Sequence, residues 1–206
     1  MKSKKALLKK SQLYLILNRD SSSLKDLDFF QGQPGIVQLR DKLADAKQIF
    51  NLALKLSKFY RKTNTLFIVN NDPILALLSL ADGVHLGQED LALKAARCIL
   101  GKDKLIGISC SNLKQALKAQ NDGADYLGIG PIYKSPLKPR SKAIGLKVLR
   151  QLKKRIKIPY FAIGNINENN LTEILATQAR RIAVSRAVLK TTHPKLTLKL
   201  LMERLK

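Results

Sequence analysis

The sequence predicts a single-domain (β/α)8 barrel, the TIM barrel fold of the α/β class, over residues 1–206. Eight short apolar runs follow one another along the chain, and each is continuous, as is typical of a strand buried on both faces. Segments of helical periodicity separate the runs with short connections, which favours parallel βαβ units. The 206 residues, 45% of them hydrophobic, are enough for one such domain.

The eight predicted strands all begin in apolar sequence and most end close to a polar residue or a glycine. We expect them at Leu13–Leu17, Ile36–Leu39, Leu66–Val69, Gly83–Leu86, Leu105–Ile108, Tyr126–Ile129, Tyr160–Ile163 and Ile182–Val184. An open doubly wound sheet is the alternative, but no Gly-x-Gly-x-x-Gly follows the first run, where a dinucleotide site would have it. A closed barrel is therefore expected.

Apolar residues at helical spacing predict a helix after each strand from the second onward. The expected apolar faces are Ile49, Ala53, Leu56 and Tyr60; Ile74, Leu77 and Leu78 after Pro73; Leu91, Ala95 and Ile99 before Gly101; and Leu113 and Leu117, capped by Ser111 or Asn112 and followed by Gly123. Further helices are expected at Leu146–Ile156, Asn169–Gln178 and Pro194–Leu205. Residues 1 to about 11 are interpreted as a basic N-terminal extension.

The chain is strongly basic, with 38 Lys and Arg against 15 Asp and Glu, a net charge of +23. Such a field attracts nucleic acid, anionic lipid or a phosphorylated substrate. The lysines are spread over all helical segments and both ends, without interleaved aromatics or a nucleic-acid-binding module. We interpret the charge first as a general surface bias and second as help in gathering anionic substrates; specific nucleic-acid binding is the third interpretation.

Sequence features also bear on localisation. No apolar run approaches the roughly 20 residues that a membrane helix needs. The basic opening lacks the apolar core and cleavage site of a signal peptide. Cys98 and Cys110 have no metal-ligand spacing, so free thiols in a reducing compartment are expected. These features predict a cytoplasmic protein.

Polar side chains follow the second predicted strand, and active groups of a barrel collect at such carboxyl ends. Because side chains alternate along a strand, Gln38, Arg40 and Lys42 project to one side while Leu39 and Asp41 take the other. An amide and two cations would then converge on the barrel mouth, where a phosphate fits. A solvated strand end is the alternative interpretation.

Oxygen-bearing side chains follow the third and fourth strands. Asn70, Asn71 and Asp72 come first, and Gln88 and Asp90 follow the next strand. Mg²⁺ on a diphosphate prefers one or two carboxylates together with phosphate oxygens and water, which such a set can supply. Asp90 also has the alternative role of a helix N-cap.

Five motifs at these strand ends resemble the thiamine phosphate synthases, and the likeness runs in matching order from about Leu13 to about Leu205. They are Gln38-Leu39-Arg40-Asp41-Lys42, Phe67-Ile68-Val69-Asn70, Ala81-Asp82-Gly83-Val84-His85-Leu86-Gly87-Gln88-Glu89-Asp90, Gly123-Ala124-Asp125-Tyr126-Leu127-Gly128-Ile129-Gly130-Pro131-Ile132-Tyr133 and Ala162-Ile163-Gly164.

The resemblance implies a barrel transferase that joins 4-amino-2-methyl-5-hydroxymethylpyrimidine diphosphate to a thiazole phosphate, with Mg²⁺ as cofactor. It implies that diphosphate leaves first and that the thiazole nitrogen captures the resulting pyrimidine methyl cation. Matching positions imply catalytic roles for Arg40, Ser109 and Lys138. Substrate binding is implied for Gln38, Arg40, Lys42, Asn70, Ser109, Ser135, Lys138, Gly164 and Ser185, and metal binding for Asp90 and for Asn71.

The chain departs from the family pattern at several of these positions. Asn71 stands where the family has a metal-binding Asp, so the resemblance implies a weakened metal site and an enzyme that this substitution impairs. Asn165 replaces the second Gly of a Gly-Gly pair, and Asn tolerates the left-handed backbone conformation better than most residues. Arg186, beside Ser185, is expected either to bind a phosphate bidentately or to obstruct its site.

Two other functions remain open. A thiazole tautomerase of the same superfamily would bind the thiazole phosphate without a diphosphate, which leaves Gln38, Arg40, Lys42 and Asp90 without a role. A catalytically silent barrel that binds phosphate compounds or nucleic acid would account for the +23 charge. His85, in the middle of a strand and without an evident carboxylate partner, is interpreted as a packed structural histidine.

Overall fold

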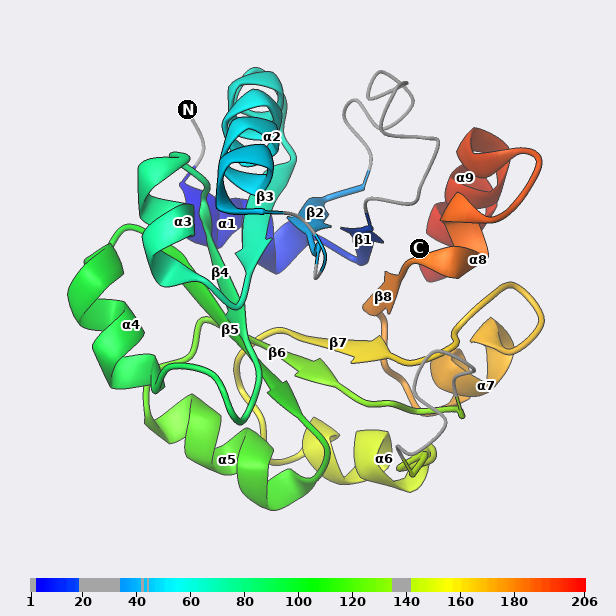
Figure 1. Cartoon of the computed structure of the whole chain (residues 1–206). Helices are drawn as coiled ribbons and strands as arrows, with labels where there is room; N and C mark the ends of the chain where they lie inside the picture. The colour runs from blue at the N-terminus through cyan, green and yellow to red at the C-terminus, as the bar shows by residue number, and fades with distance from the viewer. Residues whose placement is uncertain (1–2, 19–33, 42, 44, 135–141) are drawn as a thin grey trace.

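The computed structural model describes residues 3–18, 34–41, 43, 45–134 and 142–206. In this part of the chain, eight parallel strands close into a barrel in the order β1-β2-β3-β4-β5-β6-β7-β8, and helices surround it (Figure 1). The last strand pairs with the first, with Leu13 beside Ile182 and Leu15 beside Val184. The predicted (β/α)8 barrel is confirmed.

The strands agree closely with the sequence prediction. They are β1 Leu13–Leu17, β2 Ile36–Leu39, β3 Leu66–Asn70, β4 Gly83–Leu86, β5 Leu105–Cys110, β6 Tyr126–Ile129, β7 Tyr160–Ile163 and β8 Ile182–Val184. Only β3 and β5 run beyond the predicted ends. As a result, Asn70 and Ser109 lie within strands, where pairing with β4 and β6 holds their backbone.

The helices between the strands are α2 Ala46–Tyr60, α3 Pro73–Leu78, α4 Leu93–Leu100, α5 Leu113–Asn121, α6 Lys147–Lys153 and α7 Leu171–Ala176. Helix α1 Lys4–Lys10 precedes β1, and α8 Arg186–Leu189 and α9 Pro194–Leu205 follow β8. Asn112 caps α5 as expected, its side chain accepting a hydrogen bond from Gln115 N. Gly101 ends α4 with φ 69°. The sequence prediction missed α1 and α8.

Helix α3 buries a different face from the one predicted. Ile74, Leu77 and Leu78 are 58%, 39% and 60% exposed, whereas Leu75 and Ala76 are buried. The six-residue helix has apolar residues on all sides, so periodicity alone could not identify the face toward the barrel. Packing against its neighbours determined it.

Two hydrophobic clusters form the core. The larger lies between the strands and the surrounding helices, and the smaller fills the barrel interior with residues that include Tyr14, Ile68, Tyr126 and Phe161. Leu8 of α1 is 3% exposed and belongs to the interior cluster, beside the first residues of several strands. The basic opening segment thus contains a helix that covers the amino-terminal end of the barrel.

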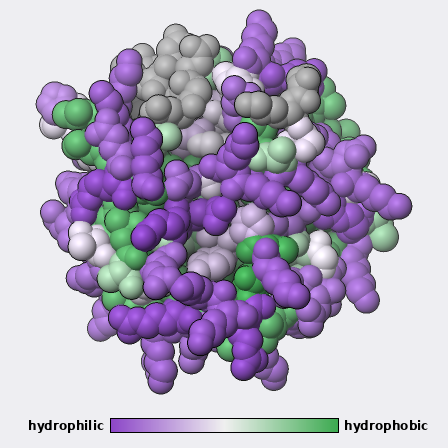
Figure 2. All heavy atoms as spheres, turned by 180° about the vertical axis from the view of Figure 1, so that it is seen from behind, coloured by the Kyte–Doolittle hydropathy of each residue, from purple (hydrophilic) through white to green (hydrophobic). Residues whose placement is uncertain are grey.

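Most of the surface is hydrophilic on the face shown in Figure 2, in keeping with the high net charge. Several basic side chains near the amino-terminal end of the barrel pair with buried or half-buried acids, such as Arg97 with Asp125 at 2.6 Å. Within the described residues, no helix is long and apolar enough to cross a membrane.

Candidate active site

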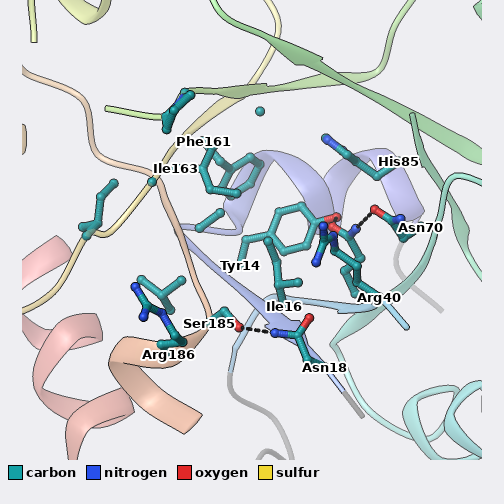
Figure 3. A pocket seen from close by; sticks show the side chains of 18 of the residues that line it. Tyr14, Ile16, Asn18, Arg40, Asn70, His85, Phe161, Ile163, Ser185 and Arg186 are labelled. Carbon is teal, nitrogen blue, oxygen red and sulfur yellow. Dashed lines mark hydrogen bonds between the residues drawn. The ribbon is translucent and has the colours of Figure 1, made fainter. Parts of the chain in front are cut away.

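A cavity of about 600 Å³ opens at the carboxyl ends of the strands. All eight strands or the residues just after them supply its lining, which includes Gln38, Ser109 and Gly128. Tyr14, Asn70, His85, Phe161 and Ser185 also line it (Figure 3). This is the volume of a typical small-molecule site, and its position is where barrel enzymes have their active sites.

One side of the cavity carries an amide pair and a cation. Gln38 is buried, and its Nε2 donates to Asn70 Oδ1 at 2.6 Å. Arg40 lines the cavity on the same side as Asn70 (Figure 3), and its backbone N–H donates to Leu17 O at 2.9 Å, which holds it at the end of β1. Asp41, expected to face away, lines the cavity as well because β2 ends at Leu39 and alternation ends with it.

The opposite side is formed by the turns after β7 and β8. Gly164 has φ 115°, and a Cβ there would lie 2.6 Å from Pro131 Cα, so this position accepts only glycine. Asn165 follows with φ 52°, the left-handed conformation expected for it. Arg186 donates to Asn165 Oδ1 at 3.4 Å, and Ser185 Oγ accepts from Asn18 Nδ2 at 3.2 Å. A guanidinium and a hydroxyl here suit a phosphate.

The floor and walls between these two sides are apolar and aromatic. Tyr14, Ile16, Phe161 and Ile163 line this part of the cavity (Figure 3). The rings of Tyr14 and Phe161 meet edge to face with centroids 5.4 Å apart. The cavity therefore offers flat apolar surface for rings between two polar ends.

His85 is buried as expected, but it also lines the cavity and has two partners. Its Nδ1 lies 3.3 Å from the Tyr126 hydroxyl and its Nε2 lies 2.9 Å from Ser109 Oγ. Burial lowers the pKa of His85 to about 4. Because the side chain is neutral at pH 7, it can both donate and accept a hydrogen bond.

The depressed pKa of His85 makes stability depend on pH. Between pH 6.5 and about 4 the unfolded chain binds a proton at this residue and the folded chain does not, so the free energy of unfolding falls as pH is lowered through this window. The loss amounts to about 3 kcal/mol at its lower end. We expect His85→Gln to flatten the dependence in urea unfolding from pH 7 to 4. The matched control is His193→Gln, at an exposed position; an equal slope in His85→Gln and wild type would contradict the prediction.

The residues predicted to bind metal do not line the cavity. Asp90 Oδ2 accepts a hydrogen bond from Gly87 N at 2.6 Å, so the carboxylate folds back on its own loop. It does not cap α4, whose N-cap is Ala92. Asn71 is exposed with φ 65°, and Asp72 caps α3 through Leu75 N. Within the described residues, no three acidic, histidine or cysteine side chains are grouped to hold a metal.

Three predicted site residues, Lys42, Ser135 and Lys138, lie outside the described residues. Of the predicted site residues within the described ranges, six line the cavity: Gln38, Arg40, Asn70, Ser109, Gly164 and Ser185. Sequence reasoning missed Tyr14, Asn18 and Phe161. Alternation within β1 and β7 was the available signal, since Tyr14 and Phe161 occupy the inward phase of their strands.

Comparisons with known proteins bear on this cavity. Residues 13–188 match the family model described as thiamine monophosphate synthase. A thiamine-phosphate synthase of Synechocystis sp. is 39% identical over 91% of this chain and 55% of its own length, and one of Methanobrevibacter smithii is 35% identical over 94% and 95%. The chain thus spans about half the length of several relatives, among them those of Synechocystis sp. and Gloeobacter violaceus.

A solved structure shows the same likeness in three dimensions. Thiamine phosphate pyrophosphorylase from Pyrococcus furiosus superposes with a TM-score of 0.86 at 32% identity, covering 98% of each chain. A 3-hexulose-6-phosphate synthase superposes with a TM-score of 0.66 at 12% identity, which shows the barrel fold alone. From the matched residues and the identity over most of the chain, we conclude that this chain belongs to the thiamine monophosphate synthase family.

Proposed function

We propose that the chain is a thiamine phosphate synthase, which joins 4-amino-2-methyl-5-hydroxymethylpyrimidine diphosphate to a thiazole phosphate and releases diphosphate. The observation that carries this proposal is the two-ended cavity. Arg40 and Asn70 form one polar end, Ser185 and Arg186 form the other, and an aromatic floor separates them. Two phosphorylated rings placed end to end would use both ends of this cavity.

In the proposed reaction the protein acts mainly by electrostatics and orientation. The bond from the pyrimidine methylene carbon to the diphosphate oxygen breaks with its electron pair on oxygen, and the thiazole nitrogen then bonds to that carbon. Arg40 stabilises the charge that develops on the departing diphosphate. The walls formed by Tyr14 and Phe161 hold the rings in line. Lys42 and Lys138 remain predicted diphosphate ligands, and Ser135 remains a predicted substrate-binding residue.

We propose Mg²⁺ as the cofactor, bound together with the diphosphate. When bound, it would neutralise charge on the leaving group. Asp90 and Asn71 are the protein groups proposed to hold it, which would require the Asp90 carboxylate to leave its hydrogen bond to Gly87 N and turn toward the cavity. One carboxylate and one amide match the preference of Mg²⁺ for few protein ligands alongside phosphate oxygens and water.

The proposed function is tested with purified protein, both precursors and Mg²⁺, with thiamine phosphate measured by chromatography. Calorimetry with each precursor separately reports binding. We expect product only with both precursors and both phosphates present. A folded protein that binds neither precursor would overturn the proposal. Binding of the thiazole phosphate alone would point to a tautomerase, and nucleic-acid binding with a steep salt dependence to a silent barrel.

Asn71→Asp tests the metal proposal. Asp adopts positive φ more readily than most residues, so the backbone at φ 65° accommodates it, and the added carboxylate should tighten Mg²⁺ binding by about tenfold. The measurements are direct Mg²⁺ titration in the presence of diphosphate and the Mg²⁺ dependence of the rate. Asn51→Asp, which adds the same charge at an exposed site on α2, is the control. Unchanged Mg²⁺ affinity would remove Asn71 from the metal site.

A further inference from the structure

Six polar side chains from six different strands form a continuous chain of contacts through the barrel. Gln38 Nε2 lies 2.6 Å from Asn70 Oδ1, and Gln38 Oε1 lies 2.9 Å from the Tyr14 hydroxyl. The Tyr14 and Tyr126 hydroxyls are 3.0 Å apart. His85 then connects Tyr126, at 3.3 Å, with Ser109, at 2.9 Å. All of these residues except Tyr126 line the cavity.

The middle of this chain is tightly enclosed. Tyr14 and Tyr126 are 2% and 0% exposed. A Cβ at Gly107 would lie 2.1 Å from Tyr126 Cζ and 2.6 Å from His85 Nδ1, and one at Gly128 would lie 3.1 Å from His85 Cε1. The rings of Tyr126 and His85 therefore occupy the space that a side chain at either glycine would take, and the two rings contact each other directly. Such enclosure makes every unmade hydrogen bond costly.

Counting hydrogens assigns a direction to the chain. The Tyr14 hydroxyl donates to Gln38 Oε1, and a hydroxyl has one hydrogen, so Tyr14 must accept from Tyr126. The Tyr126 hydrogen is then used, and its oxygen must accept from His85 Nδ1–H. A neutral imidazole has one N–H, so His85 Nε2 is an acceptor and Ser109 donates to it.

The two ends of the chain therefore have defined characters. Ser109 donates its hydroxyl hydrogen to His85 Nε2, so only its oxygen lone pairs remain for a ligand in the cavity. Gln38 donates an amide hydrogen to Asn70 Oδ1, so the Nδ2 hydrogens of Asn70 remain for a ligand. The opposite direction would require both amides to be reversed and would present a carbonyl oxygen of Asn70 beside an anionic substrate, which is unfavourable.

We propose that His85, Tyr126 and Tyr14 are positioning residues that fix this direction, so that Ser109 accepts from the substrate ring and Asn70 Nδ2 donates to an acceptor or anion of the substrate. The ligand selected at the Ser109 end is a ring with a donating amino group, and the ligand at the Asn70 end is an acceptor or anion. This inference rests on the proposed function, in which the first substrate is an aminopyrimidine diphosphate, and it names the residues that set its orientation.

The direct test is the tautomer of His85. Protein labelled with ¹⁵N-histidine and carrying His193→Gln contains one histidine, whose ring nitrogens are read by two-bond ¹H–¹⁵N correlation at pH 7. We expect the proton on Nδ1 and an unprotonated Nε2. A proton on Nε2 would overturn the proposal. If a protein with the proton on Nε2 still made thiamine phosphate, the proposed function would hold and this inference would be wrong. If the proton were on Nδ1 but the protein bound neither precursor, the direction of the hydrogen bonds would hold and the proposed function would be wrong.

Substitutions separate positioning from simple packing. Tyr126→Phe removes the acceptor for His85 Nδ1–H, so we expect a mixture of His85 tautomers and a fall of about 10- to 100-fold in kcat/KM for the aminopyrimidine diphosphate. Tyr60→Phe is the matched control, because Tyr60 is also buried and its hydroxyl has no partner within the described residues.

Selectivity provides a second readout. Wild-type protein should prefer the aminopyrimidine diphosphate over the analogue without the amino group by about 10- to 100-fold, and Ser109→Ala should lose this preference. Equal use of both compounds by the wild type, or a preference retained in Ser109→Ala, would overturn the assignment of Ser109 as the acceptor.

Discussion

Arg40→Ala should lower kcat/KM for the pyrimidine diphosphate by about 100- to 1000-fold, the largest effect expected of any single substitution in the cavity. Arg40 lines the cavity immediately after β2, on the side of Asn70. A preorganised cation at the position where negative charge develops stabilises the transition state more than the bound substrate. Removing it should therefore reduce kcat as well as raise KM, which steady-state kinetics with each substrate varied in turn would resolve.

The control for this experiment is Arg150→Ala, which removes one positive charge from an exposed position on α6. If the general charge of +23 were responsible for gathering the substrate, both variants would lose similar amounts of activity. Added salt would then abolish the difference between each variant and the wild type. A loss below about tenfold in Arg40→Ala, with the protein folded, would remove Arg40 from the diphosphate site.

Gly107→Ala should destabilise the protein by about 3 kcal/mol or more. The new Cβ would lie 2.1 Å from Tyr126 Cζ, well inside contact distance, and Tyr126 is fully enclosed by other side chains. Overpacking of a core costs about 1–3 kcal/mol even where neighbours can adjust, and here the adjustment would also break the hydrogen bonds of Tyr126 and His85. Urea unfolding at pH 7 measures the change.

Gly128→Ala is the graded comparison. Its Cβ would meet His85 at 3.1 Å, a contact that a shift of a few tenths of an ångström relieves. We expect a smaller loss of stability than in Gly107→Ala but a clear loss of activity, since the shift moves His85 away from Ser109. Equal stability of Gly107→Ala and wild type would show that the barrel interior is looser than these distances require.

Much of the site could be anticipated from sequence because it lies at strand ends. Gln38, Arg40, Asn70, Ser109, Gly164 and Ser185 all line the cavity. Five of them directly follow a predicted strand, and Gln38 is one residue from the end of its strand. The carboxyl ends of parallel strands meet at one rim whatever the details of packing. Local pattern and topology were sufficient for these positions.

Other features depended on which groups meet in space. No partner of His85 is evident from the residues near it in sequence, yet Tyr126 and Ser109 of two other strands contact it. The carboxylate of Asp90 accepts a hydrogen bond from Gly87 N within its own loop, a partner that the strand pattern does not predict. Alternation along a strand predicts the direction of a side chain and not the partner it finds there.

By itself, the sequence determined that this chain forms a closed eight-stranded barrel with the polar ends of its strands at one rim, because apolar runs and helical periodicity are local properties of the chain. Only the tertiary structure decided that α1 covers the amino-terminal end, which face α3 buries, and that a chain of six side chains crosses the barrel. These features depend on distances between residues far apart in sequence. Closing the barrel brings Tyr14 within 3.0 Å of Tyr126, and nothing in either local segment specifies that contact.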